Sequence, residues 1–459
     1  LHGLNATGRA GSDMTIDALR TGGRTSVPLA GAAPITVPGA LSGWAALVER
    51  HGNLTLAEVL EPAIRLAEDG FPVSPIIAAQ WALEVEKLQA DEGARATFLV
   101  DGERAPRAGE WFANPDLAAT FRTVAAQGPA ALYGGELGVK IVERVRELGG
   151  FLALADLRAH RAEWVEPMSV PFRGYRVWEL PPNGQGIAAL EMLRILEPLD
   201  LVGMGHNTAP YLHHLIEAKK LAFADLDRWV GDPASMEAPA ERLLDDDFID
   251  ARRRQIDPAR AAERVQPGDA LTTSETIYLA VADSAGTMVS FINSVYWEFG
   301  SGVVVPGTGF PLQNRGAGFT LQEGLPNTVA PGKRPFHTII PGFVTRPGAD
   351  GREEPYMAFG VMGGSIQPQG HVQLLLNHLV FGMDLQTAVE AARFRHYDGL
   401  RVALEPGIGQ EVRRALAALG HEPFTPSPHD MGGAQVVLRL PRGWAAASDP
   451  RKDGLAIGY

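Results

Sequence analysis

The feature that most constrains the fold of this chain is a change in the period of its hydrophobic pattern near Thr276. Residues 40–170 mainly show apolar residues at helical spacing. After Thr276 the pattern alternates over 278–282 and 287–293, with the turn residues Asp283-Ser-Ala-Gly286 between the two stretches. Alternation interrupted by such a turn predicts a β-hairpin.

Helical patterns on either side of this hairpin complete the outline. Thr55 and Glu58 form a predicted capping box ahead of an apolar segment, and 212–230 has helical spacing. Beyond the hairpin, 370–383 and 385–395 are also predicted to be helical. An order of helices, strands and helices is typical of a layered α/β fold.

Composition excludes several classes of function. The 459 residues carry a net charge of −13 with no dense block of Lys and Arg, which argues against nucleic-acid binding. There is no cysteine, so disulfides and thiolate metal sites are excluded. No run of 18 apolar residues occurs, and no membrane span is predicted. The compartment stays open, with the cytoplasm favoured.

Thr276 itself has a chemical interpretation. It follows a connector rich in Pro, Gly and Thr, residues 265–274, where cleavage would give it a new α-amine. An α-amine with a pKa of about 7.7 to 8.0 can take the proton of the hydroxyl, so the residue would carry its own base. The alternative is an ordinary strand threonine, because β-branched residues favour strands.

Glycine- and proline-rich motifs accompany the Thr276 strand along the chain. Downstream they are Phe299-Gly-Ser-Gly302, Pro306-Gly-Thr-Gly309, Asn314, residues 331–335 and Val361-Met-Gly363-Gly364-Ser365. Upstream they are Pro38-Gly-Ala-Leu-Ser-Gly-Trp44, residues 66–71, Pro181-Pro-Asn-Gly-Gln-Gly186, residues 225–233 and Ser448-Asp-Pro-Arg451. In these motifs, over almost its whole length, the chain resembles the γ-glutamyltransferase (glutathione hydrolase) family of N-terminal-nucleophile hydrolases.

The resemblance implies a four-layer αββα sandwich and cleavage between Glu275 and Thr276. The products would be a large-subunit part, 1–275, and a small catalytic subunit, 276–459, intertwined as one globular unit. Pairing of two such heterodimers stays an alternative. The implied partners are a small-molecule amide and water or an amine acceptor, with no cofactor and no metal. Family members carry several dozen residues before the segment that starts at Leu1, so the native N-terminus is expected to be missing.

The same resemblance assigns roles to a hydroxyl and two glycines. Gly363 and Gly364 match the pair that forms the oxyanion hole, where unobstructed backbone N–H groups stabilise developing charge. Ser294 matches a second hydroxyl residue that touches the nucleophile and could orient it or relay its proton. The alternative for Ser294 is a strand serine that faces solvent.

Substrate-binding positions depart from the family pattern. Typical members hold the α-amine of a γ-glutamyl group with acidic and amide side chains, where this chain has Tyr296, Arg315 and Gly318. His337 and Thr338 stand where two serines bind the α-carboxylate, and Arg9 lies near, but offset from, the expected arginine. A substrate ammonium would lose its counter-charge here and meet Arg315.

These departures predict an acyl group that has a carboxylate and no α-amine, because arginine can hold a carboxylate bidentately. Within the range of the family that the chain resembles, this points to acylases of dicarboxylic monoamides, such as glutaryl or oxamate-type amides, or to cephalosporin side-chain acylases. Alternatively, Arg315 pairs with a carboxylate of the protein. The competing functions are a true γ-glutamyl transpeptidase and an unprocessed, non-catalytic binding protein on the same fold.

His213 and His214 suggest a metal site at first sight. Adjacent helix positions face different sides, and we expect neither a carboxylate nor a histidine at ligand spacing. Structural roles are therefore favoured for both.

Overall fold

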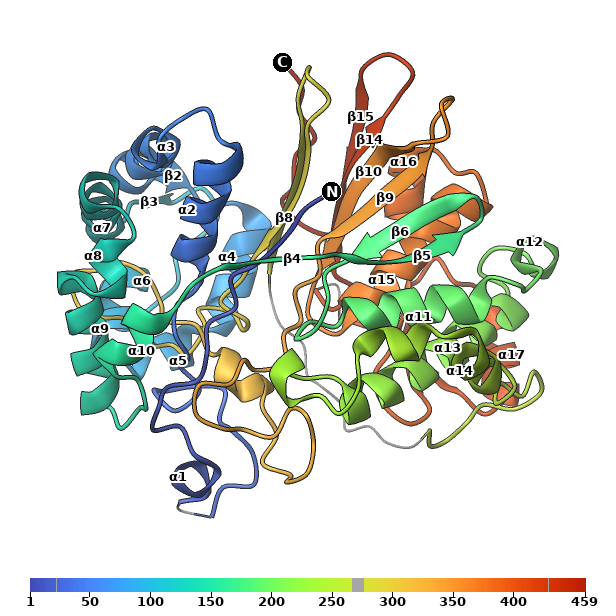
Figure 1. Ribbon diagram of the computed structural model, residues 1–459, viewed down its shortest axis with the longest axis horizontal. Coiled ribbons are helices and arrows are strands. Elements are labelled where there is room, and N and C mark those ends of the chain that lie inside the picture. The colour runs from blue at the N-terminus through green and yellow to red at the C-terminus, as the bar shows by residue number, and fades with distance from the viewer. Residues whose placement is uncertain (22, 266–275, 428) are drawn as a thin grey trace. The chain divides into compact units, whose positions relative to one another are not determined.

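The computed structural model describes residues 1–21, 23–265, 276–427 and 429–459, which fall into two compact units (Figure 1). Unit 1 consists of Leu1, Glu166–Asn293 and Thr338–Tyr459, within those limits. Unit 2 consists of His2–Val165 and Ser294–His337. Glu275, on one side of the predicted cleavage position, lies outside the described residues.

Unit 2 is mainly helical, as the pattern over 40–170 predicts. Thr55 caps α3 (Leu56–Asp69), and the predicted capping box with Glu58 is confirmed. Helix α3 packs against α7 (Pro115–Gln127) around a core that includes Ile64 and Val124. The remaining elements are α1 (Ile16–Arg20), α2 (Ala40–His51), α4 (Pro75–Leu83), α5 (Val85–Gln89), α6 (Glu92–Phe98), α8 (Ala130–Tyr133), α9 (Glu136–Glu147), α10 (Leu154–Ala159), the 3-10 turn η3 (Arg315–Gly318) and the short pairs β1 (Gly3–Asn5) with β4 (Glu163–Val165) and β2 (Phe71–Pro72) with β3 (Trp111–Phe112).

A six-stranded antiparallel sheet forms the centre of unit 1. Its order is β15-β14-β10-β9-β6-β5, and its strands come from both sides of Thr276 along the chain. They are β5 (Met168–Phe172), β6 (Tyr175–Glu179), β9 (Gly342–Pro347), β10 (Glu353–Met362), β14 (Gly433–Arg439) and β15 (Trp444–Ser448).

The predicted hairpin after Thr276 is confirmed. Strands β7 (Ile277–Ala282) and β8 (Met288–Asn293) pair antiparallel, with Ile277 opposite Asn293. The turn uses a left-handed glycine, since Gly286 has φ +91°, and the Asp283 carboxylate accepts a hydrogen bond from the Thr287 N–H at 2.9 Å. Turn chemistry and alternation thus act together to fix this ribbon.

The ribbon and a helix cover opposite faces of the central sheet. A Cβ added to Gly360 on β10 would lie 2.5 Å from the ring of Tyr278 on β7, whereas one added to Gly370 on α15 (Ile366–Leu375) would lie 2.8 Å from the side chain of Val361. Consecutive strand residues point to opposite faces. Unit 1 therefore stacks helix, sheet and ribbon, which is the layered mixed α/β arrangement that the sequence predicts.

The C-terminal helices differ from their predicted bounds. The first starts at Ile366 rather than residue 370, and a π-helical turn, η4 (Leu376–Val380), follows it. The second, α16 (Leu385–Glu390), is shorter than the predicted 385–395 because Phe394–His396 forms strand β11. The Gln373 side chain accepts a hydrogen bond from the N–H of Phe394 and donates to its carbonyl, which favours the extended backbone over a helical turn.

One more predicted helix of unit 1 is confirmed, and its remaining elements were not predicted. The helix predicted over 212–230 is α13 (Ala209–Trp229), and Thr208 caps it. The rest are α11 (Gly186–Leu196), α12 (Leu201–Met204), η1 (Pro233–Ser235), η2 (Ala240–Leu244), α14 (Asp246–Arg253), β12 (Arg401–Leu404), α17 (Gln410–Ala418) and β13 (Glu422–Phe424). None of the helices in the described ranges is long and apolar enough to cross a membrane.

A buried ion network holds the C-terminal motif in unit 1. Asp449 contacts Arg393 at 2.6 Å and Arg451 at 3.0 Å, and Arg451 also pairs with Glu405 at 2.6 Å. Burial alone would raise the pKa of Asp449, but the two arginines outweigh it and hold this pKa below its ordinary value. Each buried charge here has a partner of opposite sign, as buried charges require.

Candidate functional site

Thr276 is largely buried, with 8% of its surface exposed, and immediately precedes β7. Two contacts relate the β7–β8 ribbon to β10. Ser290, which is opposite Ala280, donates a hydrogen bond to the carbonyl of Phe359 at 3.4 Å, and the ring of Tyr278 lies against Gly360. Phe359 is thus at the level of Ala280 and Gly360 is at Tyr278. Successive residues of β10 therefore lie beside positions of β7 that are closer to Thr276.

The turn that follows β10 contains the two predicted glycines. Gly363 has φ +119° and Gly364 has φ +68°, a region that side chains disfavour. A Cβ on Gly363 would also lie 2.8 Å from Ile366 and 3.1 Å from the backbone of Gly432. The turn leads into the N-terminus of α15, where the helix dipole favours negative charge. Backbone and dipole therefore suit an oxyanion site.

Gln185 contributes to this region, and sequence reasoning missed it. Its side-chain nitrogen donates to the carbonyl of Gly364 at 2.9 Å and to that of Thr338 at 2.5 Å. The Gly364 carbonyl also accepts from the N–H of Gln367 at 3.1 Å. Gln185 lies in the motif 181–186, which contributed to the family resemblance, but the motif alone did not indicate a role for this residue.

Four of the predicted substrate-binding residues lie in unit 2, namely Arg9, Tyr296, Arg315 and His337, whereas Thr338 lies in unit 1. Arg315 is 3% exposed, and its guanidinium carbon lies 4.6 Å from the ring centroid of Tyr296. Tyr296 has φ +81°, which is unusual for a bulky residue, and its N–H donates to the hydroxyl oxygen of Ser294 at 2.8 Å. The backbone at Ser294 and Tyr296 thus presents the ring to Arg315.

The charges of this group are set by burial. Burial lowers the pKa of Arg315 to about 9, with Tyr296 opposing the shift, so the guanidinium is cationic at pH 7. Burial and then the charge of Arg315 lower the pKa of His337 well below its ordinary value, which keeps this imidazole neutral. A buried cation beside a neutral imidazole and a phenol is suited to an anionic ligand.

Arg9 and Gly318 have different surroundings. The side chain of Arg9 is 38% exposed, pairs with Glu163 at 3.4 Å and donates to the carbonyl of Gly332. Glu163 also pairs with Arg334 at 2.8 Å, so this ion cluster includes Arg9. A Cβ at position 318 would lie 2.6 Å from the carbonyl oxygen of Phe336. Gly318 therefore cannot become an aspartate without movement of the backbone nearby.

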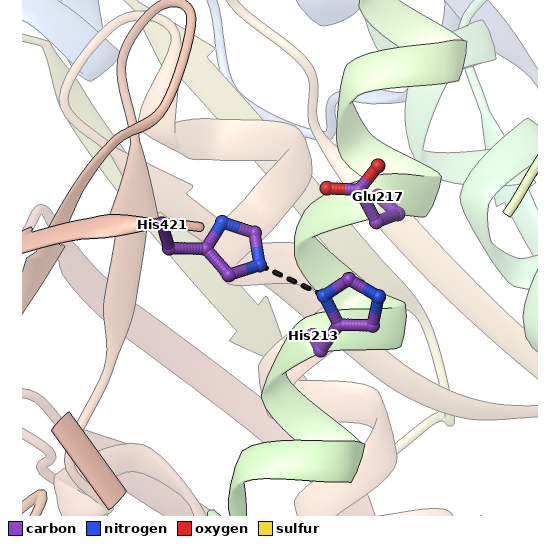
Figure 2. A group of neighbouring side chains, drawn as sticks. All are labelled: His213, Glu217 and His421. Carbon is purple, nitrogen blue, oxygen red and sulfur yellow. Dashed lines mark hydrogen bonds between the residues drawn. The ribbon is translucent and has the colours of Figure 1, made fainter. Parts of the chain in front are cut away.

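His213, Glu217 and His421 form a buried group whose ligand atoms lie within 4.8 Å of one another (Figure 2). Glu217 is four residues after His213 on α13, which is a ligand spacing. The expectation that neither a carboxylate nor a histidine accompanies His213 was therefore wrong.

The hydrogen bonds of this group nevertheless favour a structural role. Nε2 of His213 faces the carbonyl of Asp257 at 2.8 Å and must donate, so its Nδ1 accepts from Nε2 of His421 at 2.8 Å. Glu217 pairs with Lys220 at 2.7 Å. An ion between the rings would move the proton of His421 to Nδ1, which is buried and has no acceptor among the described residues. The donor set therefore fits a metal poorly.

Comparison with known proteins gives the family. The model of the γ-glutamyltranspeptidase family matches residues 1–459. The chain belongs to this family, as its motifs predict.

Named relatives place it among enzymes that act on amides. The chain is 36% identical to the glutathione hydrolase-like YwrD proenzyme of Bacillus subtilis, over 99% of this chain and 86% of the relative. It is 35% identical to the oxamate amidohydrolase proenzyme of Klebsiella pneumoniae, over 99% and 87%. The crystal structure of cephalosporin acylase from Bacillus halodurans superposes with a TM-score of 0.93 at 41% identity, covering 100% of this chain and 85% of that one. The chain is therefore an enzyme of this family, with a mixed α/β fold that matches a solved acylase.

Proposed function

We propose that this enzyme is an autoprocessed amidohydrolase or acyltransferase with Thr276 as its nucleophile. The observation that supports the proposal is the progression of contacts between the β7–β8 ribbon and β10, since it runs toward Thr276 on the ribbon and toward the turn at Gly363 after β10. The proenzyme names of the relatives support processing of this chain too. We further infer that the layers of unit 1 belong to a four-layer αββα sandwich.

Maturation uses the Thr276 hydroxyl on its own precursor. The oxygen attacks the carbonyl of Glu275, the peptide C–N bond breaks, and the acyl group moves from nitrogen to oxygen. Water then hydrolyses this ester and releases fragments 1–275 and 276–459. The hydroxyl returns, now beside a new α-amine.

Turnover repeats the same chemistry on a substrate. The neutral α-amine takes the hydroxyl proton while the oxygen attacks the amide carbonyl, and the N–H groups of Gly363 and Gly364 stabilise the oxyanion. The amine product leaves with a proton, and the acyl-enzyme ester passes to water or to an amine acceptor. Ser294 orients or relays the proton of Thr276.

The acyl group is proposed to bear a carboxylate and to lack an α-amine. Arg315, Tyr296 and His337 support this, because a buried cation beside neutral side chains favours an anion and repels an ammonium group. Thr338 completes the predicted binding residues, and Arg9 acts at most through its ion cluster with Glu163. One relative is named for oxamate, whose acyl part bears a carboxylate and has no α-amine.

A glutathione hydrolase is the second candidate, because the YwrD relative is named as glutathione hydrolase-like. The two candidates differ in the acyl group that is turned over faster. Comparison of glutaryl-p-nitroanilide with γ-glutamyl-p-nitroanilide separates them.

The test of the nucleophile is a denaturing gel with N-terminal sequencing of the smaller fragment. Wild-type protein should give two fragments, the smaller beginning at Thr276. Thr276→Ala should stay a single chain and lose turnover by about 10⁴-fold or more, as when a covalent nucleophile is removed. Active wild-type enzyme that runs as one full-length band, or a fragment that starts at Thr272 or Thr273, would overturn the assignment.

A further inference from the structure

One buried amide links two parts of unit 1 that the proposed function uses for different purposes. Gln185 immediately precedes α11 and has no exposed surface. Its Nε2 donates to the carbonyl of Thr338, at a predicted substrate-binding position, and to that of Gly364, in the predicted oxyanion turn.

The orientation of this amide is determined by its partners. Two backbone carbonyls can only accept, so the atom that faces both of them must be the nitrogen. If the amide were turned over, its oxygen would face two other oxygens. Gln185 therefore acts as a double donor in one fixed orientation.

The Gly364 carbonyl needs this support more than an ordinary carbonyl would. Gly363 and Gly364 have no side chains that could be fixed by packing, and both lie in the left-handed region. The turn is held by hydrogen bonds to its carbonyl groups: Gln185 and the N–H of Gln367 on Gly364, and Gln369 on Ser365 at 3.1 Å. The direction of the N–H groups in the turn depends on these bonds.

We propose that Gln185 is a positioning residue for the acyl-transfer step: it holds the Gly363–Gly364 turn in the geometry that receives the oxyanion and ties it to the backbone at Thr338. This inference rests on the proposed function. It assigns Gln185 no contact with the substrate, so removal should lower kcat and leave KM nearly unchanged.

Gln373 offers a matched control in the same unit. It is also a buried glutamine, and its Nε2 also donates to two backbone carbonyls, those of Gln369 at 3.0 Å and Phe394 at 3.1 Å. Those carbonyls belong to α15 and β11 rather than to the glycine turn. Loss of this amide should cost stability without a comparable loss of kcat.

The experiment compares Gln185→Leu, Gln185→Glu and Gln373→Leu with wild type, each as mature, cleaved and folded protein assayed on glutaryl-p-nitroanilide. We expect kcat to fall at least tenfold in Gln185→Leu, since small misplacement of catalytic groups is costly, with KM changed less than about threefold. In Gln373→Leu, kcat should stay within about twofold of wild type. The carboxylate that Gln185→Glu introduces cannot donate when it is ionised, whereas its protonated form can, so kcat of this variant relative to wild type should recover as the pH is lowered.

Two results would overturn the inference: kcat of Gln185→Leu within fivefold of wild type, or an equal loss of kcat in Gln373→Leu. If Gln185→Leu fails to fold, the pH profile of Gln185→Glu decides, and a ratio to wild type that does not rise at low pH counts against the role. Failure of the proposed function would give a different result: either active wild-type protein is uncleaved, or the Thr276→Ala variant retains turnover. In that case the Thr276 experiment fails before any Gln185 variant is compared.

Discussion

Two buried arginines, one in each unit, have different neighbours. In unit 1, Arg393 contacts Asp449 at 2.6 Å and donates to the carbonyl of Met431 at 3.0 Å. In unit 2, Arg315 lies over the ring of Tyr296. Burial lowers the pKa of both; at Arg393 the opposing influence is led by Asp449, and at Arg315 it comes from Tyr296.

The kind of neighbour, a carboxylate or an aromatic ring, suggests a way to separate structural arginines from functional ones. A carboxylate partner cancels the charge of Arg393 within the protein, and the pair then maintains the position of the C-terminal motif. An aromatic ring attracts a cation and does not neutralise its charge. Binding of an anionic substrate group by Arg315 stays a prediction. Substitutions at the two sites should therefore affect different quantities.

The largest effect is expected at Asp449. Asp449→Asn leaves Arg393 buried without its charge partner and should lower the free energy of unfolding by about 3 to 5 kcal/mol. Because the pKa of Asp449 is depressed in the folded state, its stabilisation is complete above about pH 5 and is lost as the pH falls through the folded pKa. The difference between wild type and variant in urea unfolding should shrink at low pH, and a difference that grows there would contradict the pairing.

The next largest effect is expected at Gly363 in unit 1, which is proposed to contribute a backbone N–H group rather than a charge. Gly363→Val forces a side chain into a turn with φ +119° and against Ile366, and should lower kcat by about 100-fold or more, as loss of one oxyanion donor does. The assay requires mature, folded protein. Gly409 is the control: a Cβ there has open space, so Gly409→Ala should leave kcat unchanged. Near-normal kcat in Gly363→Val would remove this glycine from the mechanism.

The smallest effect is a change in preference at Arg315. Wild-type enzyme should have a higher kcat/KM for glutaryl-p-nitroanilide than for the γ-glutamyl compound, and Arg315→Gln should reduce this ratio by about tenfold, or roughly 1.4 kcal/mol. Arg20→Gln, which removes an arginine of unit 2 that pairs with Glu323, is the control. A clear wild-type preference for the γ-glutamyl compound would contradict the assigned specificity.

Gly318 limits how far this last test can be extended. The family pattern suggests adding an acidic residue at position 318 to restore amine binding. The carbonyl of Phe336 lies only 2.6 Å from where the Cβ would stand. The single substitution at Arg315 is therefore the more informative change.

The features predictable from sequence were those specified by local interactions. The capping box at Thr55 and the hairpin after Thr276 depend on residues within a few positions of one another, and both are confirmed. The helix predicted through residue 395 was wrong because Gln373, twenty-one residues before Phe394, fixes the strand by tertiary hydrogen bonds. Local propensity cannot report such a contact.

For the site, sequence motifs identified candidate residues but did not reveal the residue that hydrogen-bonds the glycine turn. Gly363 and Gly364 were predicted, and their left-handed backbone agrees with a turn that requires glycine. Gln185 is 179 positions from Gly364, and no spacing in the sequence connects them. The role of Thr276 remains a prediction that the gel and the Thr276→Ala variant address, and the role of Ser294 remains a prediction.

The division of the chain between the two units has a consequence for biosynthesis. Unit 2 needs residues 294–337 in addition to its first 165, and the central sheet of unit 1 pairs β6 with β9, which is made more than 160 residues later. A ribosome that has produced only residues 1–275 has therefore completed neither unit. Long-range pairing of this kind delays folding until most of the chain is available. Separately synthesised halves should consequently be poor substitutes for the continuous chain. The cleavage proposed before Thr276 should occur only after the whole polypeptide has folded.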